Sequence, residues 1–204
     1  ILVDGSGNLY IGGGFTFVGS VAANRVAKWN GSSWSALGSG INNFVRSLAM
    51  VGTDLYAGGD FTTAGGVAVN AIAKWDGTAW SALGGGLNGR ADAMAVIGTD
   101  LYVGGQFTTA DGASANYIAK WNGSAWSTFG TGASSNISAM LAVGADLYIA
   151  GTFTTINGVS ANGIAKWDGS TWSALGLGLN NNVLALAASG TDIYAAGAFT
   201  AAGG

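Results

Sequence analysis

The sequence predicts an all-β fold made of four-stranded units that repeat at a fixed interval. The first observation is the repeat itself: the pair Leu-Tyr, once Ile-Tyr, returns every 46 residues, at 9–10, 55–56, 101–102, 147–148 and 193–194. Phe-Thr and Ala-Lys-Trp keep the same interval. The second observation is that β-branched and aromatic residues fill short runs between glycine-rich turns, without helical periodicity. Four-stranded units of this length that stack on one another are typical of a β-propeller.

Each unit is expected to contain four antiparallel strands, which the third unit illustrates. An apolar run at 93–100 ends in a Gly-Thr-Asp turn, and further strands are expected at 101–108, 117–121 and 125–130. Asn-Gly or Asp-Gly separates the third strand from the fourth, and this dipeptide is a strong hairpin signal because both residues accept positive φ. The Asp of each Gly-Thr-Asp turn is interpreted in the same way, as a residue chosen for its turn geometry.

Two tryptophans flank each Asn-Gly or Asp-Gly step. In the fourth unit, a two-residue turn at 168–169 is expected to place Trp172 opposite Ala165 rather than opposite Trp167. Both indoles then lie on one face of the sheet, diagonally across the hairpin. Burying one indole contributes about 4–6 kcal/mol, which is much less than the entropy lost by ordering a whole unit. One unit is therefore not expected to fold alone, and the indoles are expected to pack between neighbouring blades.

The whole chain, 1–204, is predicted to form one propeller repeat domain with four complete blades and half of a fifth. The expected blades cover 1–40, 41–86, 87–132 and 133–178, with a partial blade at 179–204. The chain has more residues than four blades need and fewer than five blades need. An unclosed end exposes an apolar blade face and an unpaired strand edge. We therefore expect a segment of a longer repeat protein or a chain completed by a partner, in preference to a closed four-bladed ring.

The composition excludes several classes of function. Charged residues make up 8% of the chain, the formal net charge is −3, and there is no basic stretch that could bind nucleic acid. Cys and His are absent, so disulfides, thiol chemistry and the commonest general base are not available. No apolar run is long enough to suggest insertion into a membrane. We expect no enzymatic activity, no metal and no cofactor.

The order of aromatic and glycine residues resembles the kelch-type propeller blade. Tyr56, Gly58 and Gly59 fit the end of its second strand, and Trp75 and Trp80 follow at suitable distances. The longer pattern LYxGGxFT…AKWxGxxWSALGxG is similar to repeats of bacterial secreted proteins and of fungal polarity-marker surface proteins. This resemblance implies a non-catalytic role as a binding or structural scaffold outside the cell or at its surface. It carries over no functional residue.

Candidate binding residues come from the loops that vary between units. In an antiparallel blade, the connections between blades and the loops between the second and third strands lie at one end, whereas the uniform tight turns lie at the other. Binding residues tend to lie on loops that a rigid scaffold holds. The variable end is therefore predicted to contact a protein or a glycan, with Asn43, Arg46, Arg90, Asp92, Asn136 and Asn182 as candidates. Simple drift of exposed loops is the alternative explanation.

Other recurring polar residues allow further hypotheses. Lys28, Lys74, Lys120 and Lys166 occupy one position of the repeat and could form an anion-binding ring, although stems packed on a neighbouring blade explain them as well. Recurring Asn residues such as Asn70 and Asn116 precede the third strand; they are expected to hydrogen-bond loop backbone, and a carbohydrate-binding lectin is the sharper alternative. An enzyme that uses Asp92 or Asp111 is a further, weaker alternative.

Overall fold

The computed structural model describes residues 1–203 as an all-β chain of repeated antiparallel sheets. Blade one contains β1 (Leu2–Val3), β2 (Leu9–Gly12), β5 (Val26–Trp29) and β6 (Trp34–Ala36). Blade two contains β7 (Val45–Val51), β8 (Asp54–Gly59), β11 (Ile72–Trp75) and β12 (Trp80–Ala82). Blade three contains β13 (Ala91–Ile97), β14 (Asp100–Gly105), β17 (Ile118–Trp121) and β18 (Trp126–Thr128).

Blade four contains β19 (Ile137–Val143), β20 (Asp146–Gly151), β23 (Ile164–Trp167) and β24 (Trp172–Ala174). A half-blade follows, with β25 (Val183–Ser189) and β26 (Asp192–Gly197). Four complete blades and part of a fifth were predicted, and this architecture is confirmed.

The loops between the second and third strands also contain short two-stranded ribbons, which the sequence did not predict. These ribbons are β3 (Phe17–Val18) with β4 (Val21–Ala22), β9 (Thr63–Ala64) with β10 (Val67–Ala68), β15 (Thr109–Ala110) with β16 (Ala113–Ser114), and β21 (Thr155–Ile156) with β22 (Val159–Ser160). Each ribbon turns on a residue with positive φ, such as Gly19 or Gly65.

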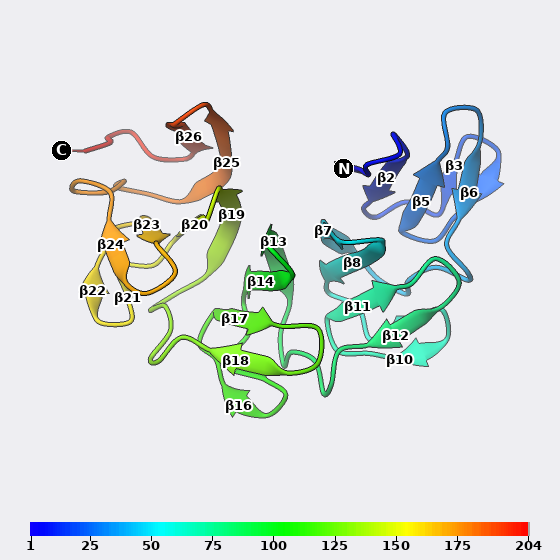
Figure 1. Ribbon diagram of the computed structural model, residues 1–204, viewed down its shortest axis with the longest axis horizontal. Helices are drawn as coiled ribbons and strands as arrows, with labels where there is room; N and C mark the ends of the chain where they lie inside the picture. Colours follow the sequence, from blue (N-terminus) through cyan, green and yellow to red (C-terminus); the bar gives the residue numbers. More distant parts are fainter. Residues whose placement is uncertain (204) are drawn as a thin grey trace.

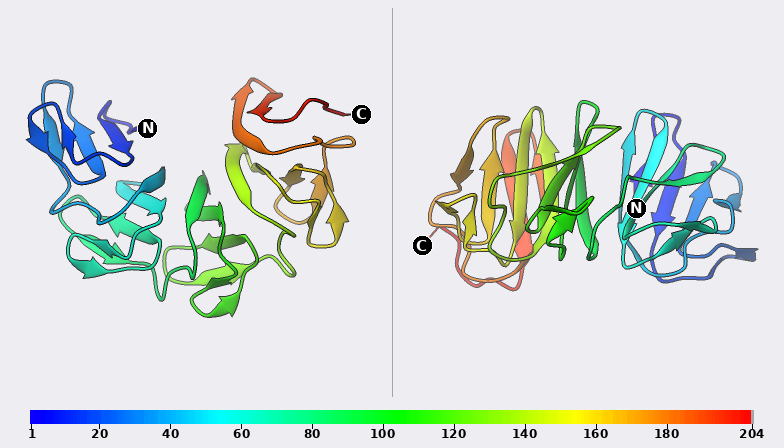
Figure 2. Two further views of the ribbon diagram at one scale, coloured as in Figure 1. Left: turned by 180° about the vertical axis from the view of Figure 1, so that it is seen from behind. Right: turned by 90° about the horizontal axis from the view of Figure 1, so that it is seen from below.

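The blades are arranged along an open arc. Figure 1 shows the first and last blades on opposite sides of the opening, with the first strand of each blade towards the centre. Seen from the side in Figure 2, the blades stand next to one another like upright wedges. Neighbouring first strands pack together: β7 contacts β13, β13 contacts β19, and β19 contacts β25. The central strands therefore hold successive blades in register.

The tryptophan pairs fill the contacts between blades, which we call seams and number by the blades that they join. Trp80 is 4% exposed and packs in one core cluster with Leu37 and Ile41, from the segment that precedes blade two. Its indole Nε1–H donates a hydrogen bond of 2.9 Å to the carbonyl oxygen of Leu37. Trp126 makes the same bond, of 2.8 Å, to Leu83 one seam further along. The expectation that indoles join neighbouring blades is confirmed.

The register of the tryptophan hairpin differs from the prediction. Trp167 lies directly opposite Trp172, and Ala165 lies opposite Ala174. The two rings are 5.3 Å apart between centroids. The turn is longer than expected because the Asp168 carboxylate accepts hydrogen bonds from the backbone N–H groups of residues 170 and 171, which moves the turn centre by one residue. Both indoles still share one face of the sheet.

The first glycine of each Gly-Gly pair allows close contact across the seam. A Cβ atom on Gly58 would lie 2.9 Å from the Cβ of Ala91, on the first strand of the next blade. Ala150 replaces this glycine in blade four, where it is fully buried with Val183. The second glycine lies under a β-bulge, at which the pairing of the inner strand shifts between Val45 and Ser47.

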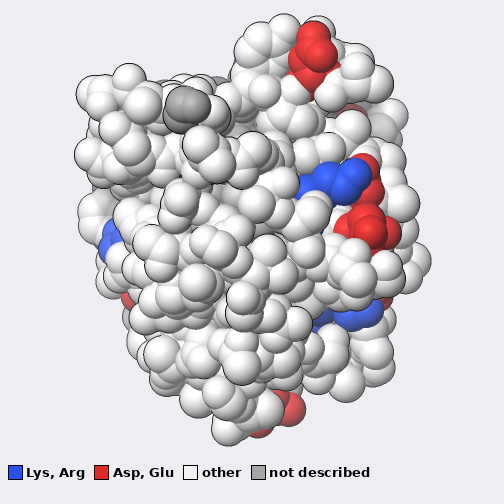
Figure 3. All heavy atoms as spheres, turned by 90° about the vertical axis from the view of Figure 1, so that its left-hand side faces the viewer, with Lys and Arg blue, Asp and Glu red and all other residues white. Residues whose placement is uncertain are grey.

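The half-blade leaves apolar side chains in contact with solvent. Leu184 is 61% exposed and Tyr194 is 56% exposed, whereas Tyr56 at the same repeat position of blade two is buried. Figure 3, which faces this side of the molecule, shows few charged groups, and blue and red atoms lie beside one another. In blade two, strand β11 covers the edge of β8, and β26 has no such neighbour among the described residues.

Candidate functional site: the loop face

The connections between blades and the two-stranded ribbons meet at one end of the blades, which we call the loop face. Isolated backbone bridges join them at every seam, Ile41 with Ala64, Leu87 with Ala110, Ala133 with Ile156, and Leu179 with Ala202. The sequence placed these two kinds of loop at the same end, and the bridges confirm that placement. The tight turns between the first and second strands lie at the opposite end, which we call the turn end.

Lysine side chains at the turn end pair with aspartates of the same blade. The Lys74 Nζ lies 3.0 Å from Asp54 Oδ2, and Lys120 and Lys166 make equivalent pairs with Asp100 and Asp146. The Asp54 hydrogen bond raises the pKa of Lys74. These aspartates begin the second strand and bind lysine, so the idea that they serve turn geometry is wrong. An anion-binding ring of lysines also has no support, because each of these three charges is already paired.

Blade one departs from this arrangement. Asn8 stands where the other blades have an aspartate, and Lys28 lies over the ring of Tyr10, 5.4 Å from its centroid. The Asp4 carboxylate accepts hydrogen bonds from Asn8 instead, and these lower the pKa of Asp4.

A repeated set of hydrogen bonds fixes the backbone of the loop face. The side-chain amide of Asn70 donates to the Gly85 carbonyl oxygen at 2.8 Å, and the Asn70 carbonyl accepts from Leu87 N–H. The same side-chain bond recurs at Asn24, Asn116 and Asn162. A Cβ on Gly86, whose φ is +71°, would lie 2.6 Å from the Asn70 carbonyl oxygen. These asparagines hold loop backbone, which confirms the structural interpretation of their recurrence.

A second asparagine clamps each connection to the next blade. The Asn88 side chain accepts hydrogen bonds from the N–H groups of Thr108 and Thr109, and its amide donates to the Thr108 hydroxyl. Asn42 and Asn180 make the same three contacts, and the Ser134 hydroxyl accepts the two backbone bonds at the remaining seam. These clamps were not predicted, although an asparagine two residues after the Gly-x-Gly step at three of the four seams was their signal.

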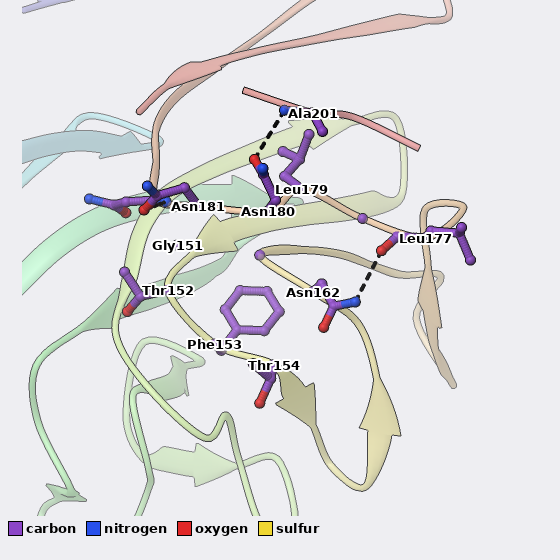
Figure 4. A pocket seen from close by; sticks show the side chains of 13 residues that line it. Gly151, Thr152, Phe153, Thr154, Asn162, Leu177, Leu179, Asn180, Asn181 and Ala201 are labelled. Carbon is purple, nitrogen blue, oxygen red and sulfur yellow. Dashed lines mark hydrogen bonds between the residues drawn. The ribbon is translucent and has the colours of Figure 1, made fainter. Parts of the chain in front are cut away.

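This backbone frame borders an open hollow at three seams, and we call these the seam hollows. The hollow of seam 4–5 has a volume of about 400 Å³, and that of seam 2–3 about 500 Å³. In Figure 4, Phe153 lies at the base of the seam 4–5 hollow, with Thr152, Thr154 and Asn181 around it. The hollow of seam 1–2, again about 500 Å³, is lined by the corresponding positions of the repeat.

The lining residue directly before the third strand has a left-handed backbone in each hollow. The φ values are 68° at Arg25 in seam 1–2, 61° at Ala71 in seam 2–3 and 67° at Gly163 in seam 4–5. The corresponding residue of seam 3–4 is Tyr117, with φ of 66°, and its ring packs on the core of blade four. A side chain in this conformation costs about 1–2 kcal/mol relative to glycine. Three of four copies therefore place a side chain where glycine would be less strained.

Four of the predicted binding residues gather near seam 2–3. Arg46 Nε lies 2.6 Å from Asp60 Oδ2 and 3.7 Å from Asp92 Oδ1, and Arg90 Nε lies 2.9 Å from Asp92 Oδ1. The Asn43 amide donates to the Asp60 carbonyl oxygen. The carboxylate of Asp92 is therefore held between two guanidinium groups. The bulge of each inner strand aims Arg46 and Asp92 at this cluster.

The two remaining predicted residues lie further along the arc. Asn136 Oδ1 is buried and has no hydrogen-bond partner among the described residues, and Asn182 Oδ1 accepts a bond of 3.4 Å from Ser138. Within residues 1–203, no hydrogen bond or ion pair joins the Asn136 or Asn182 side chain to the charged residues around Asp92. The structure thus divides the six residues into a charged group and a neutral group.

Asp111 Oδ1 accepts a hydrogen bond of 2.6 Å from Gly85 N–H, so this aspartate serves the same frame. Among residues 1–203, no group of three or more acidic side chains is placed to hold a metal ion. The search of these residues also found no helix suited to cross a membrane.

Comparison with known proteins agrees with this description. Four-stranded blades arranged radially, joined by a repeated loop frame, define a β-propeller domain. The family model described as Rax2 C-terminal beta propeller domain matches residues 35–187. The chain therefore belongs to the Rax2 C-terminal beta propeller domain family. No curated protein matches it. The crystal structure of the computationally designed Ika8 protein is similar over 83% of this chain and 86% of its own, with 14% identity and a TM-score of 0.30.

Proposed function

We propose that this propeller is a non-catalytic binding scaffold that acts outside the cell or at its surface through its loop face. The observation that carries the proposal is the repetition of the seam hollow on one backbone frame, with different side chains at each seam. Loops that a rigid scaffold holds are where binding residues concentrate. The location is supported by the resemblance of the repeat to surface proteins and by the family to which the chain belongs.

The same proposal includes that this domain has no enzymatic activity. Three aspartates that could act as acids or bases are occupied: Asp92 lies between two arginines, Asp111 accepts a backbone hydrogen bond, and Asp54 pairs with Lys74. General acid–base catalysis needs a group that is free to exchange a proton with substrate. These contacts favour a scaffold over a hydrolase or lyase.

A glycan is the ligand class that competes with a protein ligand. The seam 4–5 hollow favours the glycan, because Thr152, Thr154 and Asn181 supply neutral hydroxyl and amide groups. The charged group around Asp92 suits a protein surface instead. Asn70 and Asn116, which suggested a lectin from the sequence, do not favour the glycan by themselves, since their amides bind loop carbonyls.

Ligand arrays with paired variants test the proposal. The purified domain is applied to a glycan array and to an array of extracellular protein domains, together with Arg90→Ala, Asn182→Ala and the control Lys74→Ala. The control is matched, because the Lys74 and Arg90 side chains are 33% and 32% exposed and both form an ion pair. We expect binding that is weakened by the loop-face variants and unchanged in the control. Equal effects of all three variants, or no binding on either array, would contradict the proposal.

Self-association or further blades could also cover the open side of the arc. The exposed Tyr194 and Leu184 and the uncovered edge of β26 support an additional contact there. Sedimentation across protein concentration is the measurement, with Tyr194→Asp as the variant. We expect concentration-dependent association that this variant weakens, and a monomer at all concentrations would reject it for this chain.

A further inference from the structure

We propose that the seam 1–2 hollow binds the carboxylate of an acidic sugar, a hexuronate, and that Arg25 recognises it. The inference rests on the proposed function, because it assumes that the loop face binds ligands. It adds a specific site, a ligand class and a residue that determines specificity. The bonding of Arg25, its backbone conformation and its neighbours in the hollow support this site.

The guanidinium of Arg25 has bonding capacity that the protein does not use. Within residues 1–203, Arg46 and Arg90 each pair with a carboxylate, and Arg25 pairs with none. Its Nε is buried without a hydrogen-bond partner, and its Nη1 makes a single bond of 3.3 Å to the Phe15 carbonyl oxygen. A guanidinium normally satisfies several donors, and its planar fork fits a carboxylate with two parallel hydrogen bonds.

The backbone of Arg25 shows that its side chain is not required by the fold. At the same position and nearly the same φ, the chain carries Ala71 in one seam and Gly163 in another. The left-handed conformation disfavours a long side chain relative to glycine. A strained residue with an unsatisfied donor, on the wall of a hollow, is a reasonable starting point for a functional hypothesis.

The neighbours of Arg25 favour a ligand with hydroxyl groups. The hollow of about 500 Å³ is also lined by Thr16, Ser39, Thr63 and Asn42, and no aspartate lines it. The only large apolar residue in its lining, Ile41, is 2% exposed, so no large apolar side chain is open to a peptide ligand in this hollow. Neutral hydroxyls beside one cation match a sugar that carries one carboxylate, and the volume lies within the usual range of ligand sites.

The three seam hollows differ in charge while sharing one frame. Seam 1–2 has the cation Arg25 without an aspartate, seam 2–3 combines Asp60 with Arg90, and the lining of seam 4–5 is uncharged. Seam 1–2 is therefore the hollow among these three that selects for an anion. The chain itself supplies the matched comparison for an experiment.

The experiment is an NMR titration of the ¹⁵N-labelled domain with a hexuronate disaccharide. A methyl-esterified form of the same disaccharide serves as the uncharged probe, and an Asp-rich peptide serves as the competing class. The variants are Arg25→Gly, Arg25→Lys and the control Lys28→Ala, which removes an unpaired cation outside the hollow. Arg25→Gly is expected to fold, because Gly163 adopts the same φ, and thermal unfolding verifies this.

We expect the hexuronate to shift the amide signals of Asn24, Arg25 and Asn42. The methyl ester and the Arg25→Gly variant should each weaken binding by about tenfold or more, since one hydrogen-bonded charge pair is lost. Arg25→Lys should retain part of the affinity, and Lys28→Ala should retain all of it. Gly163→Arg should create hexuronate binding at seam 4–5, which a purely structural role for the arginine does not predict.

Four results would overturn the inference. The first is equal binding of acid and ester, the second is unchanged binding by Arg25→Gly, and the third is tighter Arg25-dependent binding of the acidic peptide than of the sugar. Absence of hexuronate binding also overturns it. In that case, array ligands that remain sensitive to Arg90→Ala or Asn182→Ala leave the proposed function standing, whereas the loss of both kinds of binding rejects both.

Discussion

The two ends of the blades use the same 46-residue period in different ways. At the turn end, both backbone and side chains repeat, as the pairs of Lys74 with Asp54 and Lys120 with Asp100 show. At the loop face, the backbone and its asparagine frame repeat, but the residues that face the hollows do not. The difference teaches that the fold and the binding surface are encoded by separate positions of one repeat. The following predictions test this separation, from the largest expected effect to the smallest.

The largest effect is expected inside the seams, which both ends share. Trp80→Ala removes a ring that is 4% exposed and a hydrogen bond to the Leu37 carbonyl. We expect the free energy of unfolding in urea to fall by about 3–5 kcal/mol. Trp34→Ala, in blade one, is the control, because Trp34 is only partly buried and packs against no earlier blade among the described residues. Equal losses for the two variants would show that the seam contact is not what the tryptophan contributes.

Adding a Cβ atom to a glycine in the backbone frame of the loop face should destabilise the fold. Gly86→Ala combines a positive φ with a Cβ placed 2.6 Å from the Asn70 carbonyl oxygen. We expect a loss of about 2 kcal/mol or more in unfolding free energy, since both strain and steric overlap contribute. Gly98→Ala, at the turn end, has a similar φ and no atom within 4 Å of the added Cβ, so about 1 kcal/mol is expected there. A loss that is no greater at Gly86 would contradict the frame.

Side chains outside the frame should matter little for stability. Lys74→Ala at the turn end and Arg90→Ala at the loop face each break a partly exposed ion pair. Such pairs contribute about 0–1 kcal/mol, so both variants should unfold within that range of the parent. If the turn end and the loop face have separate functions, the Lys74→Ala and Arg90→Ala variants differ only in ligand binding. Urea titrations provide the stability values, and a loss well above this range for Arg90→Ala would place it in the fold instead.

The smallest effect concerns the pH dependence of the turn end. Hydrogen bonds from the N–H of Ala79 and from Thr78 lower the pKa of Asp76 from 3.8 to about 2. A depressed carboxyl pKa stabilises the fold above the unfolded value, and this stabilisation is lost as pH falls through the folded value. Asp76→Asn should therefore remove a decline in stability between about pH 4 and pH 2. Asn122 already makes the same turn contacts in blade three.

Thermal unfolding of parent and variant across this pH range is the measurement. Identical pH profiles would mean that the turn hydrogen bonds do not favour the charged form of Asp76. The Asp168→Asn variant repeats the test in blade four, where equivalent bonds also lower the pKa of the carboxyl group.

Much of the fold could be predicted from the sequence, because the period fixes which residues take equivalent places. The strands, the blade count and the role of the indoles follow from Leu-Tyr and Trp repeating together. The register of the Trp167–Trp172 hairpin could not be predicted from the dipeptide alone, since the Asp168 side chain changes where the chain turns. The Asp54–Lys74 pairing was readable in principle, because the two residues recur together and both are replaced or unpaired in blade one.

The candidate site was less accessible to sequence reasoning. Variation between copies correctly directed attention to the loops, and Arg46, Arg90 and Asp92 do cluster there. Arg25 was overlooked because it directly precedes a strand and looks unremarkable in the sequence. Its left-handed φ and its unpaired guanidinium are three-dimensional properties that no local pattern reveals.

The shared φ near 65° at Arg25, Ala71, Tyr117 and Gly163 has a wider consequence. This position is interchangeable, because four very different residues occupy it in one backbone conformation. Successive copies of this position lie one blade apart. A substitution at one copy therefore does not alter the residue that lines the next hollow. Three of the four positions line a seam hollow, so hollows of different chemistry follow one another along the arc.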